Sequence, residues 1–485
     1  MDSKKRFFLE SLAFLVLILW IVSEVNAVLM IKDNSGFSNN QGAFNGFYNL
    51  KAGSADVLLI GSSHCQQNLS PQSLYNSSGI RSYNLGSSGQ KLINSYYWLK
   101  EALKYQHPKA IVLETWSFFI DPAINEAAIR KGFMSMKLSP LKIQGIHAAC
   151  KDNPKLDEAS FYFHNLRFHE RWKSLKAEDF MGKQLKERSE TKGYLPNFGH
   201  SRYRDFKALD LEGNQGTENV LDVNMKYIKK IVELCDEKSV KLIFLTTPSS
   251  KWTAEKHNFV ERFGNQHNIK YIDFNTKEYF SKLDNFDYYS DAADLGGHLN
   301  VRGAEKVTLA LGVILSDNLM LKRKKDIQWE AGRDFHKWIK KCFVLHETDD
   351  FLKYLETLKD KRFAFFVLKP ARVNYVNKNI SKMLKIPKEN INENYASAFF
   401  KNEKASEAAN KNKLITTGFL DDKKLKYTIN LNDSGGSIVV NNYNERVSFT
   451  PKRKGISFIV YDYRNMKVID KVTFTKKKGK LVAVR

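Results

Sequence analysis

Three short segments carry side chains that could act together on an ester or a phosphoryl group. They are GSSH at residues 61–64, YNLGSSGQ at residues 83–90 and DAADLGGHLNVRG at residues 291–303. A serine hydroxyl becomes a nucleophile when a general base takes its proton, and that base needs a group that fixes its tautomer. Together the three segments supply hydroxyls, an imidazole, carboxylates and glycines whose amides can approach a substrate closely. This combination favours nucleophilic catalysis by a serine.

Ser63 is the candidate nucleophile, because Gly61 permits a sharp exit from a strand and the local amides could stabilise an oxyanion. His298 is the candidate base, with carboxylates a few residues away. Each segment alone has a simpler interpretation: a Gly-Ser-Ser turn is typical of a phosphate cradle or a plain turn, and a single loop histidine is often structural. The presence of all three, in this order, favours the catalytic interpretation.

The elements around these segments predict an α/β fold. An apolar run typical of a buried strand lies at residues 56–60, and further strands are predicted at residues 82–85, 110–113, 240–245 and 270–273. Helical spacing is found at residues 92–105, 219–235 and 301–319, whereas residues 73–80 are polar and predict turns. Residues from about 120 to 216 are aromatic, basic and loop-rich, which predicts a partly helical insertion. The alternation implies a doubly wound parallel sheet, whose ligand sites gather at the carboxyl ends of the strands.

On the residues quoted above, the chain resembles the SGNH (GDSL-type) hydrolase superfamily over residues 54–320. The motifs GSSH, YNLGSSGQ and GHLN are similar to those of the membrane-anchored branch, which includes alginate O-acetylation proteins and the D-alanyl transfer protein of teichoic-acid modification. The resemblance implies a flavodoxin-like fold without a cofactor or metal, in which Ser63 is the nucleophile and His298 the base. The amides of Ser63 and Gly89 would form the oxyanion hole.

The chain departs from the superfamily pattern at two places. The Gly-x-Asn block with its oxyanion-hole Asn is absent, and the corresponding strand ends in LETW at residues 113–116. The acidic partner normally lies two or three residues before the histidine, where this chain has Leu295 and Gly296. Asp294 is expected to reach His298 if the Gly296-Gly297 pair curls the loop. Asp291 and Glu114 remain alternative acids.

The N-terminus predicts the compartment. Lys4, Lys5 and Arg6 precede an apolar stretch that reaches about residue 30, and such a charged cluster stays on the cytoplasmic side. We expect residues 1–30 to be a retained transmembrane anchor with the catalytic domain outside the cytoplasm. The alternatives are a signal peptide cleaved after VNA at residues 25–27, which would secrete the protein, and a buried helix of a cytosolic protein.

Charge and cysteine content exclude several classes of protein. The chain has 485 residues with 77 Lys and Arg against 53 Asp and Glu, a net charge of +24. An exported chain with this charge is expected to contact an acidic polysaccharide, a wall polymer or an anionic membrane, and no nucleic acid. A Lys-rich proteome would produce the same excess. The four cysteines are widely separated, which excludes a zinc finger and a disulfide-rich scaffold.

The last third of the chain is predicted to be a separate module. Residues 322–326 (KRKKD) are expected to be a solvated linker after a catalytic domain at 31–325. Residues 341–485 predict a smaller β-rich α+β domain, with strands at 343–345, 363–367, 436–441 and 454–462, a closing strand near 467–470, a helix at 349–359 and a solvated Lys-rich end at 476–480. The segment from Gly455 to Asp470 resembles the interleukin-like EMT inducer (PANDER-like) domain, which implies a glycan-associated role. A β-rich spacer or dimerisation unit is the alternative.

The sequence therefore predicts an extracytoplasmic acyl-transfer enzyme, an O-acetyltransferase or esterase that modifies a cell-surface or secreted polysaccharide. A multi-spanning membrane O-acyltransferase is an expected partner. The alternative is a glycan-binding or scaffolding protein that keeps the fold with little or no catalysis. Phosphate transfer or nucleotide binding is disfavoured because neither glycine-rich segment has the P-loop lysine or the G-x-G-x-x-G spacing.

Overall fold

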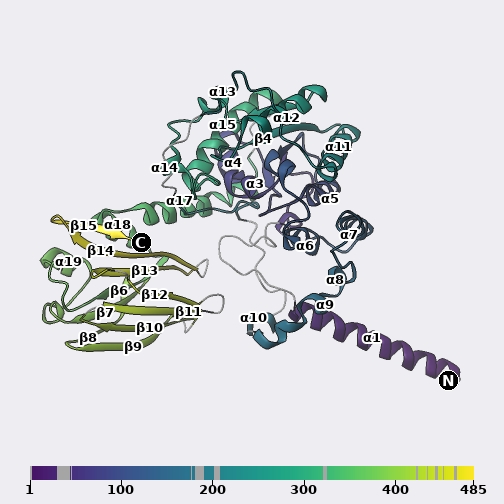
Figure 1. The fold of residues 1–485 in the computed structure, drawn as a ribbon. Coiled ribbons are helices and arrows are strands. Elements are labelled where there is room, and N and C mark those ends of the chain that lie inside the picture. The colour runs from purple at the N-terminus through teal and green to yellow at the C-terminus, as the bar shows by residue number, and fades with distance from the viewer. Residues whose placement is uncertain are drawn as a thin grey trace. The chain divides into compact units, whose positions relative to one another are not determined.

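The computed structural model describes most of the chain in two compact units. The described residues are 3–29, 44, 46–175, 177–180, 190–200, 208–320, 325–421, 424–433, 435–442, 446–451, 453–463 and 467–485. One unit ends at Lys337 and the other is Trp338–Arg485 (Figure 1). The predicted linker residues Lys322, Arg323 and Lys324 lie outside the described residues.

The first unit is built on a five-stranded parallel sheet. Its strands are β1 (Val57–Ile60), β2 (Ser82–Asn84), β3 (Ala110–Glu114), β4 (Lys241–Thr246) and β5 (Lys270–Asp273). They pair in the order β2-β1-β3-β4-β5. This is the flavodoxin-like order, in which the chain reverses direction across the sheet between β1 and β3. The predicted fold class is confirmed, and the segment that follows β1 begins at this switch point.

Helices cover both faces of the sheet, because alternate residues of each strand point to opposite sides. Leu58, Ile111 and Phe244 pack with the helices α5 (Leu92–Ala102), α11 (Asp222–Glu237) and α12 (Ala254–Gln266). Leu59 and Val112, on the other face, pack with α3 (Ser63–Asn68), α4 (Pro71–Ser78) and α15 (Val301–Leu319). The short helices η1 (Thr115–Phe119), α13 (Lys277–Phe280), α14 (Tyr288–Asp291) and α16 (Ile327–Glu330) complete this part of the unit.

The insertion after β3 is helical over most of its described length. It contains α6 (Glu126–Met134), α7 (Pro140–Asp152), α8 (Ala159–Tyr162), α9 (His164–Phe168), η2 (His169–Ser174) and α10 (Ala177–Phe180). Residues 190–200 return to the sheet: the Asn84 amide donates to the Lys192 carbonyl (2.9 Å), and the Leu195 amide donates to the Gln66 carbonyl (2.9 Å). The parts of the predicted insertion at 176, 181–189 and 201–207 lie outside the described residues.

One helix of the first unit, α1 (Ser3–Leu29), is long and apolar enough to cross a membrane. Its residues from Phe7 to Ile21 are largely exposed to solvent, as expected for a surface that faces lipid. A signal sequence near an N-terminus can meet the same criteria of length and apolar composition, so retention as an anchor stays a prediction.

The second unit combines antiparallel sheets with a few helices. Its helices are α17 (Arg333–Glu347), which begins in the first unit, α18 (Phe351–Leu358), α19 (Lys378–Met383) and η3 (Lys388–Asn390). A six-stranded sheet has the order β15-β14-β13-β6-β7-β8, and a four-stranded sheet has the order β12-β11-β10-β9. Their bounds are β6 Phe363–Lys369, β7 Asn394–Phe400, β8 Glu403–Asn410, β9 Lys413–Leu420, β10 Leu425–Asn432, β11 Gly435–Asn441, β12 Arg446–Phe449, β13 Ile456–Asp462, β14 Lys467–Lys477 and β15 Lys480–Val484. One apolar cluster takes residues from both sheets, including Phe366 and Tyr427.

Several predicted elements of secondary structure were wrong. Residues 343–345 belong to helix α17, whose buried Trp338, Cys342 and Leu345 follow helical spacing, and a three-residue apolar run cannot distinguish helix from strand. Residues 71–78 form helix α4 instead of turns, because the Ser70 hydroxyl caps the Ser73 amide and Pro71 begins the helix.

The end of the chain also differs from its prediction. The strand predicted near residues 467–470 extends to Lys477, and β15 rather than this strand closes the sheet. Residues 476–480 are exposed, as predicted, but they form the turn of the β14–β15 hairpin instead of a tail. Lys478 and Gly479 both have positive φ there (47° and 80°), as a tight two-residue hairpin turn requires.

Candidate active site

Ser63 is the first residue of helix α3 and comes directly after the turn that leaves β1. Ser62 caps the helix, its hydroxyl accepting from the His64 amide (3.2 Å), which fixes the entry into the helix. Gly61 has φ +157°, and a Cβ there would lie 2.6 Å from the Cβ of Glu114. A side chain at position 61 would therefore push β1 away from β3, so glycine is required by the close approach of the two strand ends.

Ser63, His298 and Asp294 form a hydrogen-bonded chain. His298 Nε2 lies 2.8 Å from Ser63 Oγ, and His298 Nδ1 lies 2.7 Å from Asp294 Oδ2. Burial by itself raises the pKa of Asp294, but hydrogen bonds from the His298 side chain and from the amides of His298 and Gly297 lower it to about 2. Ionised Asp294 holds the proton on Nδ1, which leaves Nε2 free to accept the proton of Ser63.

The Gly296-Gly297 turn brings Asp294 back to the imidazole although it lies four residues earlier. Gly296 has φ +81°, and the amides of Gly297 (2.6 Å) and His298 (2.9 Å) both donate to Asp294 Oδ1. The loop is also held from outside, because the Leu299 amide donates to Asn68 Oδ1 (2.9 Å) on helix α3. The loop therefore has the curl that the glycine pair predicted. The residue after His298 is held by the helix that carries Ser63.

The two alternative acids have other partners. Asp291 is fully buried and its carboxylate binds Arg302 Nε and Lys306 Nζ, each at 2.8 Å. Glu114 Oε2 accepts from the amide and the hydroxyl of Ser62 (3.0 and 2.7 Å), and its Oε1 accepts from the Trp116 amide (2.6 Å). The structure therefore places Asp294, and neither alternative, against His298.

The second segment lies beside helix α3. Asn84 Nδ2 donates to the carbonyls of Cys65 (2.7 Å) and Leu69 (2.9 Å), and the Ser87 amide donates to the Gly61 carbonyl (3.2 Å). Gly89 follows in the same loop with φ +69° and faces the start of insertion helix α6. The amide of Ser63 belongs to the first turn of its helix, where amides have no acceptor within the helix. The two predicted oxyanion residues thus lie in the first turn of α3 and in the loop after β2, which are joined by the bond from Ser87 to Gly61.

An aromatic stack that the sequence did not predict flanks the reacting pair. The ring of His64 lies 4.7 Å from that of His298 and stacks on Trp116, with ring centroids 4.3 Å apart. Burial, and to a lesser degree the neighbouring His298, holds the pKa of His64 well below its ordinary value. A neutral His64 can therefore support the His298 ring without opposing its protonation. The only sequence signal was the position of His64 beside Ser63.

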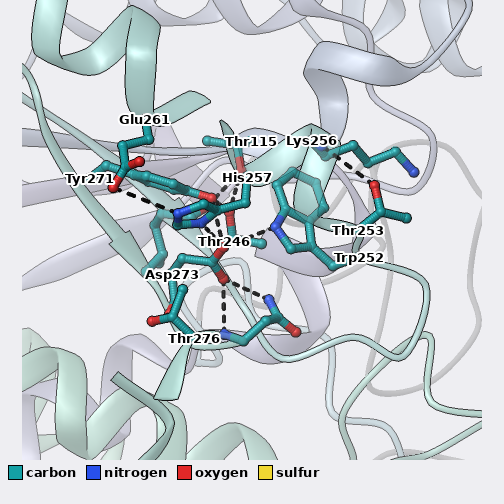
Figure 2. A network of polar contacts seen from close by, with 12 residues as sticks. Thr115, Thr246, Trp252, Thr253, Lys256, His257, Glu261, Tyr271, Asp273 and Thr276 are labelled. Atoms are coloured by element: carbon teal, nitrogen blue, oxygen red, sulfur yellow. Dashed lines mark hydrogen bonds and ion pairs between the residues drawn. The ribbon is translucent and has the colours of Figure 1, made fainter. Parts of the chain in front are cut away.

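A buried polar network joins side chains at the ends of β3, β4 and β5 (Figure 2). Thr115 Oγ1 and Thr246 Oγ1 lie 2.6 Å apart, and Thr246 Oγ1 lies 2.8 Å from the Tyr271 hydroxyl. Asp273 Oδ2 accepts from Tyr271 (2.9 Å) and Trp252 Nε1 (2.9 Å). His257 Nδ1 lies 2.7 Å from the same oxygen. The ring of Trp252, which the network holds, lies 5.8 Å from that of Trp116 between centroids. The network therefore helps to fix Trp116, on which His64 stacks.

Comparisons with known proteins found similarity at the level of solved structures. No family model and no curated protein matches the chain. A GDSL-like lipase of Bacteroides thetaiotaomicron is 10% identical and has a TM-score of 0.28, with 59% of this chain and 98% of that chain covered. A chain described as a lipolytic protein of the G-D-S-L family, from Desulfitobacterium hafniense, is 12% identical with a TM-score of 0.27 over 53% of this chain and 98% of that one. Likeness at this level assigns no family, so the function is argued from the site itself.

Proposed function

We propose that the chain is a serine acyl-transfer enzyme of the SGNH type, an esterase or O-acetyltransferase. The observation that carries the proposal is the unbroken chain Asp294–His298–Ser63, with distances of 2.7 and 2.8 Å. The three residues lie at the carboxyl ends of the strands, beside the switch point at which parallel sheets of this order bind ligands. Their order and spacing match what nucleophile, base and orienting acid require.

In the first half of the proposed reaction, Ser63 Oγ attacks the carbonyl carbon of an ester while His298 Nε2 takes the hydroxyl proton. The negative charge on the carbonyl oxygen would be stabilised by the amides of Ser63 and Gly89. Collapse of the tetrahedral intermediate breaks the bond to the alcohol oxygen, which leaves with the proton from His298. The product is an acyl group on Ser63.

In the second half, a hydroxyl group attacks the acyl-Ser63 carbonyl, with His298 again taking the proton. Collapse of this second tetrahedral intermediate breaks the bond between the acyl carbon and Ser63 Oγ, which takes the proton back from His298. If water attacks, the reaction is hydrolysis; if a sugar hydroxyl attacks, the acyl group is transferred. The Gly-x-Asn block of the superfamily, with its oxyanion-hole Asn, is absent here: the corresponding strand β3 ends in Glu114, whose carboxylate is bonded to Ser62 and Trp116. A site with fewer oxyanion donors is better suited to a bound acceptor than to rapid general hydrolysis, which favours transfer.

The proposed substrate is a cell-surface or secreted polysaccharide. Two features support this: the apolar N-terminal helix α1, whose first turns carry Lys4, Lys5 and Arg6, and the net charge of +24. A membrane anchor would place the site outside the cytoplasm, next to acidic glycans or wall polymers and to a multi-spanning acyltransferase that could supply acyl groups. The β-rich second unit would then bind or position the glycan.

A scaffolding role without catalysis is the second candidate. The missing oxyanion-hole Asn is the observation that favours it, since β3 ends in Glu114. A protein that only binds glycan has no need for a serine bonded to a histidine that a carboxylate orients, so the contacts of Ser63, His298 and Asp294 favour catalysis.

Labelling with a fluorophosphonate tests the proposal on the full chain in detergent. Activated serines react with this probe and leave a covalent adduct, so we expect the wild-type chain to be labelled and Ser63→Ala to be unlabelled. Ser78→Ala, on helix α4 outside the site, is the matched control and should label as wild type. Absence of labelling in the wild-type chain, or equal labelling of Ser63→Ala, would overturn the assignment and favour the scaffold.

A further inference from the structure

The C-terminal end of α1 is fixed to the insertion helices. Arg171 of η2 donates through Nη1 to the carbonyls of Leu29 (2.8 Å) and Val28 (3.3 Å), and through Nη2 to Asp179 (2.6 Å). The Asn165 amide of α9 donates to Asn26 Oδ1 (3.1 Å). Figure 1 shows α9 and α10 beside this end of α1. The insertion thus supplies hydrogen-bond donors to the carbonyls of Val28 and Leu29 at the end of α1. These bonds hold this part of the insertion against the end of α1.

The same segments expose large apolar side chains. Phe163, Leu166, Trp172 and Phe180 are 49%, 52%, 66% and 66% exposed, and we call these four residues the insertion patch. The segment is not loose, because neighbouring Phe161 is buried and lies under the guanidinium of Arg130, 4.1 Å from its ring centroid. One side of the segment is therefore built into the unit, while the other presents aromatic and aliphatic groups outward.

From this arrangement we infer that the insertion patch lies in the interfacial layer of the bilayer that α1 spans. The inference rests on the proposed membrane location of α1. The span Lys4–Leu29 has 26 residues, about 39 Å of helix, against about 30 Å of hydrocarbon. Its last turn therefore emerges among the headgroups, and whatever is bonded to that turn lies at the same depth.

The composition of the segment fits that depth. Tryptophan is enriched at membrane interfaces, and short amphipathic elements bury their apolar groups at the boundary between headgroups and acyl chains. Arg167 and Lys173 are 55% and 57% exposed and can extend towards headgroup phosphates. Glu126 lies 3.8 Å from Arg167 and Glu170 lies 3.4 Å from Lys173, so the surface around the insertion patch carries both signs of charge and is not strongly basic. Insertion of the patch should therefore persist at high salt and in uncharged lipid.

Spin-label depth measurements on the full chain in phosphatidylcholine liposomes test the inference. The partly exposed Cys150 is replaced by Ala, and a single nitroxide is attached at residue 163, 166, 172 or 180 through a Cys substitution. Val313 on α15, 64% exposed and remote in sequence, is the matched control, and Leu17 within α1 is the reference for a lipid position. The relaxation of each label by apolar oxygen and by a water-soluble nickel chelate is then measured and compared.

We expect labels in the insertion patch to be relaxed more by oxygen than by the nickel chelate, at depths between those of residues 17 and 313, with no change at high salt. Patch labels that respond like residue 313 while residue 17 is deep would overturn the inference and leave the anchor intact. Patch labels shielded from both reagents would also overturn it, in favour of a protein partner. A label at residue 17 that is accessible to the nickel chelate would refute the anchor and the inference together.

Discussion

The hydrogen bond between Ser63 Oγ and His298 Nε2 predicts that the two residues act as one unit. Ser63→Ala and His298→Ala should each lower acyl turnover by about 10³-fold or more, and the double variant should be scarcely slower than either single variant. Turnover of a chromogenic acetyl ester, measured for all three variants, checks this. Losses that multiply in the double variant would show that the two side chains act independently.

The different partners of Asp294 and Asp291 predict different effects of replacing each by Asn. Asp294→Asn should lower turnover severely, by up to about 10⁴-fold, because the imidazole would settle in the wrong tautomer. Asp291→Asn should leave the chemistry nearly intact but lower the free energy of unfolding by about 1–3 kcal/mol, because a neutral amide with one acceptor oxygen would replace the buried carboxylate that binds the partly exposed cations of Arg302 and Lys306. Turnover and urea unfolding are measured on the same preparations.

Glu114→Gln belongs in the same experiment. We expect it to reduce turnover less than Asp294→Asn, since Glu114 contacts Ser62 and Trp116 rather than His298. If Glu114→Gln proved to be the most damaging of the three variants, the acidic partner would come from β3 and the assignment of Asp294 would be wrong.

Glu114 also predicts a pH dependence of stability. Burial raises the pKa of Glu114 to about 7, against about 4.3 for an unfolded glutamate. Between these values the folded state holds a proton that the unfolded state has lost, so stability falls as pH rises from about 4.5 to about 7. Urea unfolding at several pH values should show a shallower decline for Glu114→Gln than for the wild type. A decline of equal steepness in both proteins would contradict the raised pKa.

At the scale of elements, the loop between α14 and α15 depends on the conformation of Gly296. A Cβ at this position would lie 2.4 Å from Ser250 Oγ, on a backbone with φ +81°. Gly296→Ala should therefore displace the loop, separate Asp294 from His298 and lower turnover. Gly213→Ala is the matched control, because Gly213 has φ +75° with nothing within 4 Å. The control should lose about 1 kcal/mol of stability and no activity. Equal activity of the two variants would show that the turn does not position Asp294.

Comparison of prediction and structure shows which elements the sequence determines locally. The strands β1, β3 and β4 were predictable because each contains a short apolar run, and the more polar β2 and β5 followed from the strand–helix alternation around them. The Gly296-Gly297 curl followed from two adjacent glycines. The strands β7 to β10, β12 and β15 were missed: β8, for example, has the sequence EKASEAAN, which is polar and alanine-rich and becomes a strand through pairing with β7. Such tertiary pairing overrides the weak local preference.

The same reasoning applies to the candidate site. Ser63, His298 and Asp294 could be proposed from residue types, but their distances depend on contacts such as Asn68 with Leu299, which are 231 residues apart. The bonds of Glu114 to Ser62 and the stacking of His64 on Trp116 also join separate segments. No periodicity or local motif encodes these contacts, so sequence reasoning left Glu114 as an alternative acid and gave His64 no role.

For the whole molecule, the net charge of +24 predicts how the protein binds its proposed substrate. Attraction between exposed charges decays over about 10 Å at 0.1 M salt and about 3 Å at 1 M. Binding of the full chain in detergent to an acidic polymer, such as alginate, should therefore weaken steeply as salt rises, whereas a neutral dextran should bind weakly with little salt dependence. Fluorescence anisotropy with labelled polymers measures both. Salt-independent binding of alginate, or equal affinity for dextran, would show that specific contacts rather than the overall charge select the glycan.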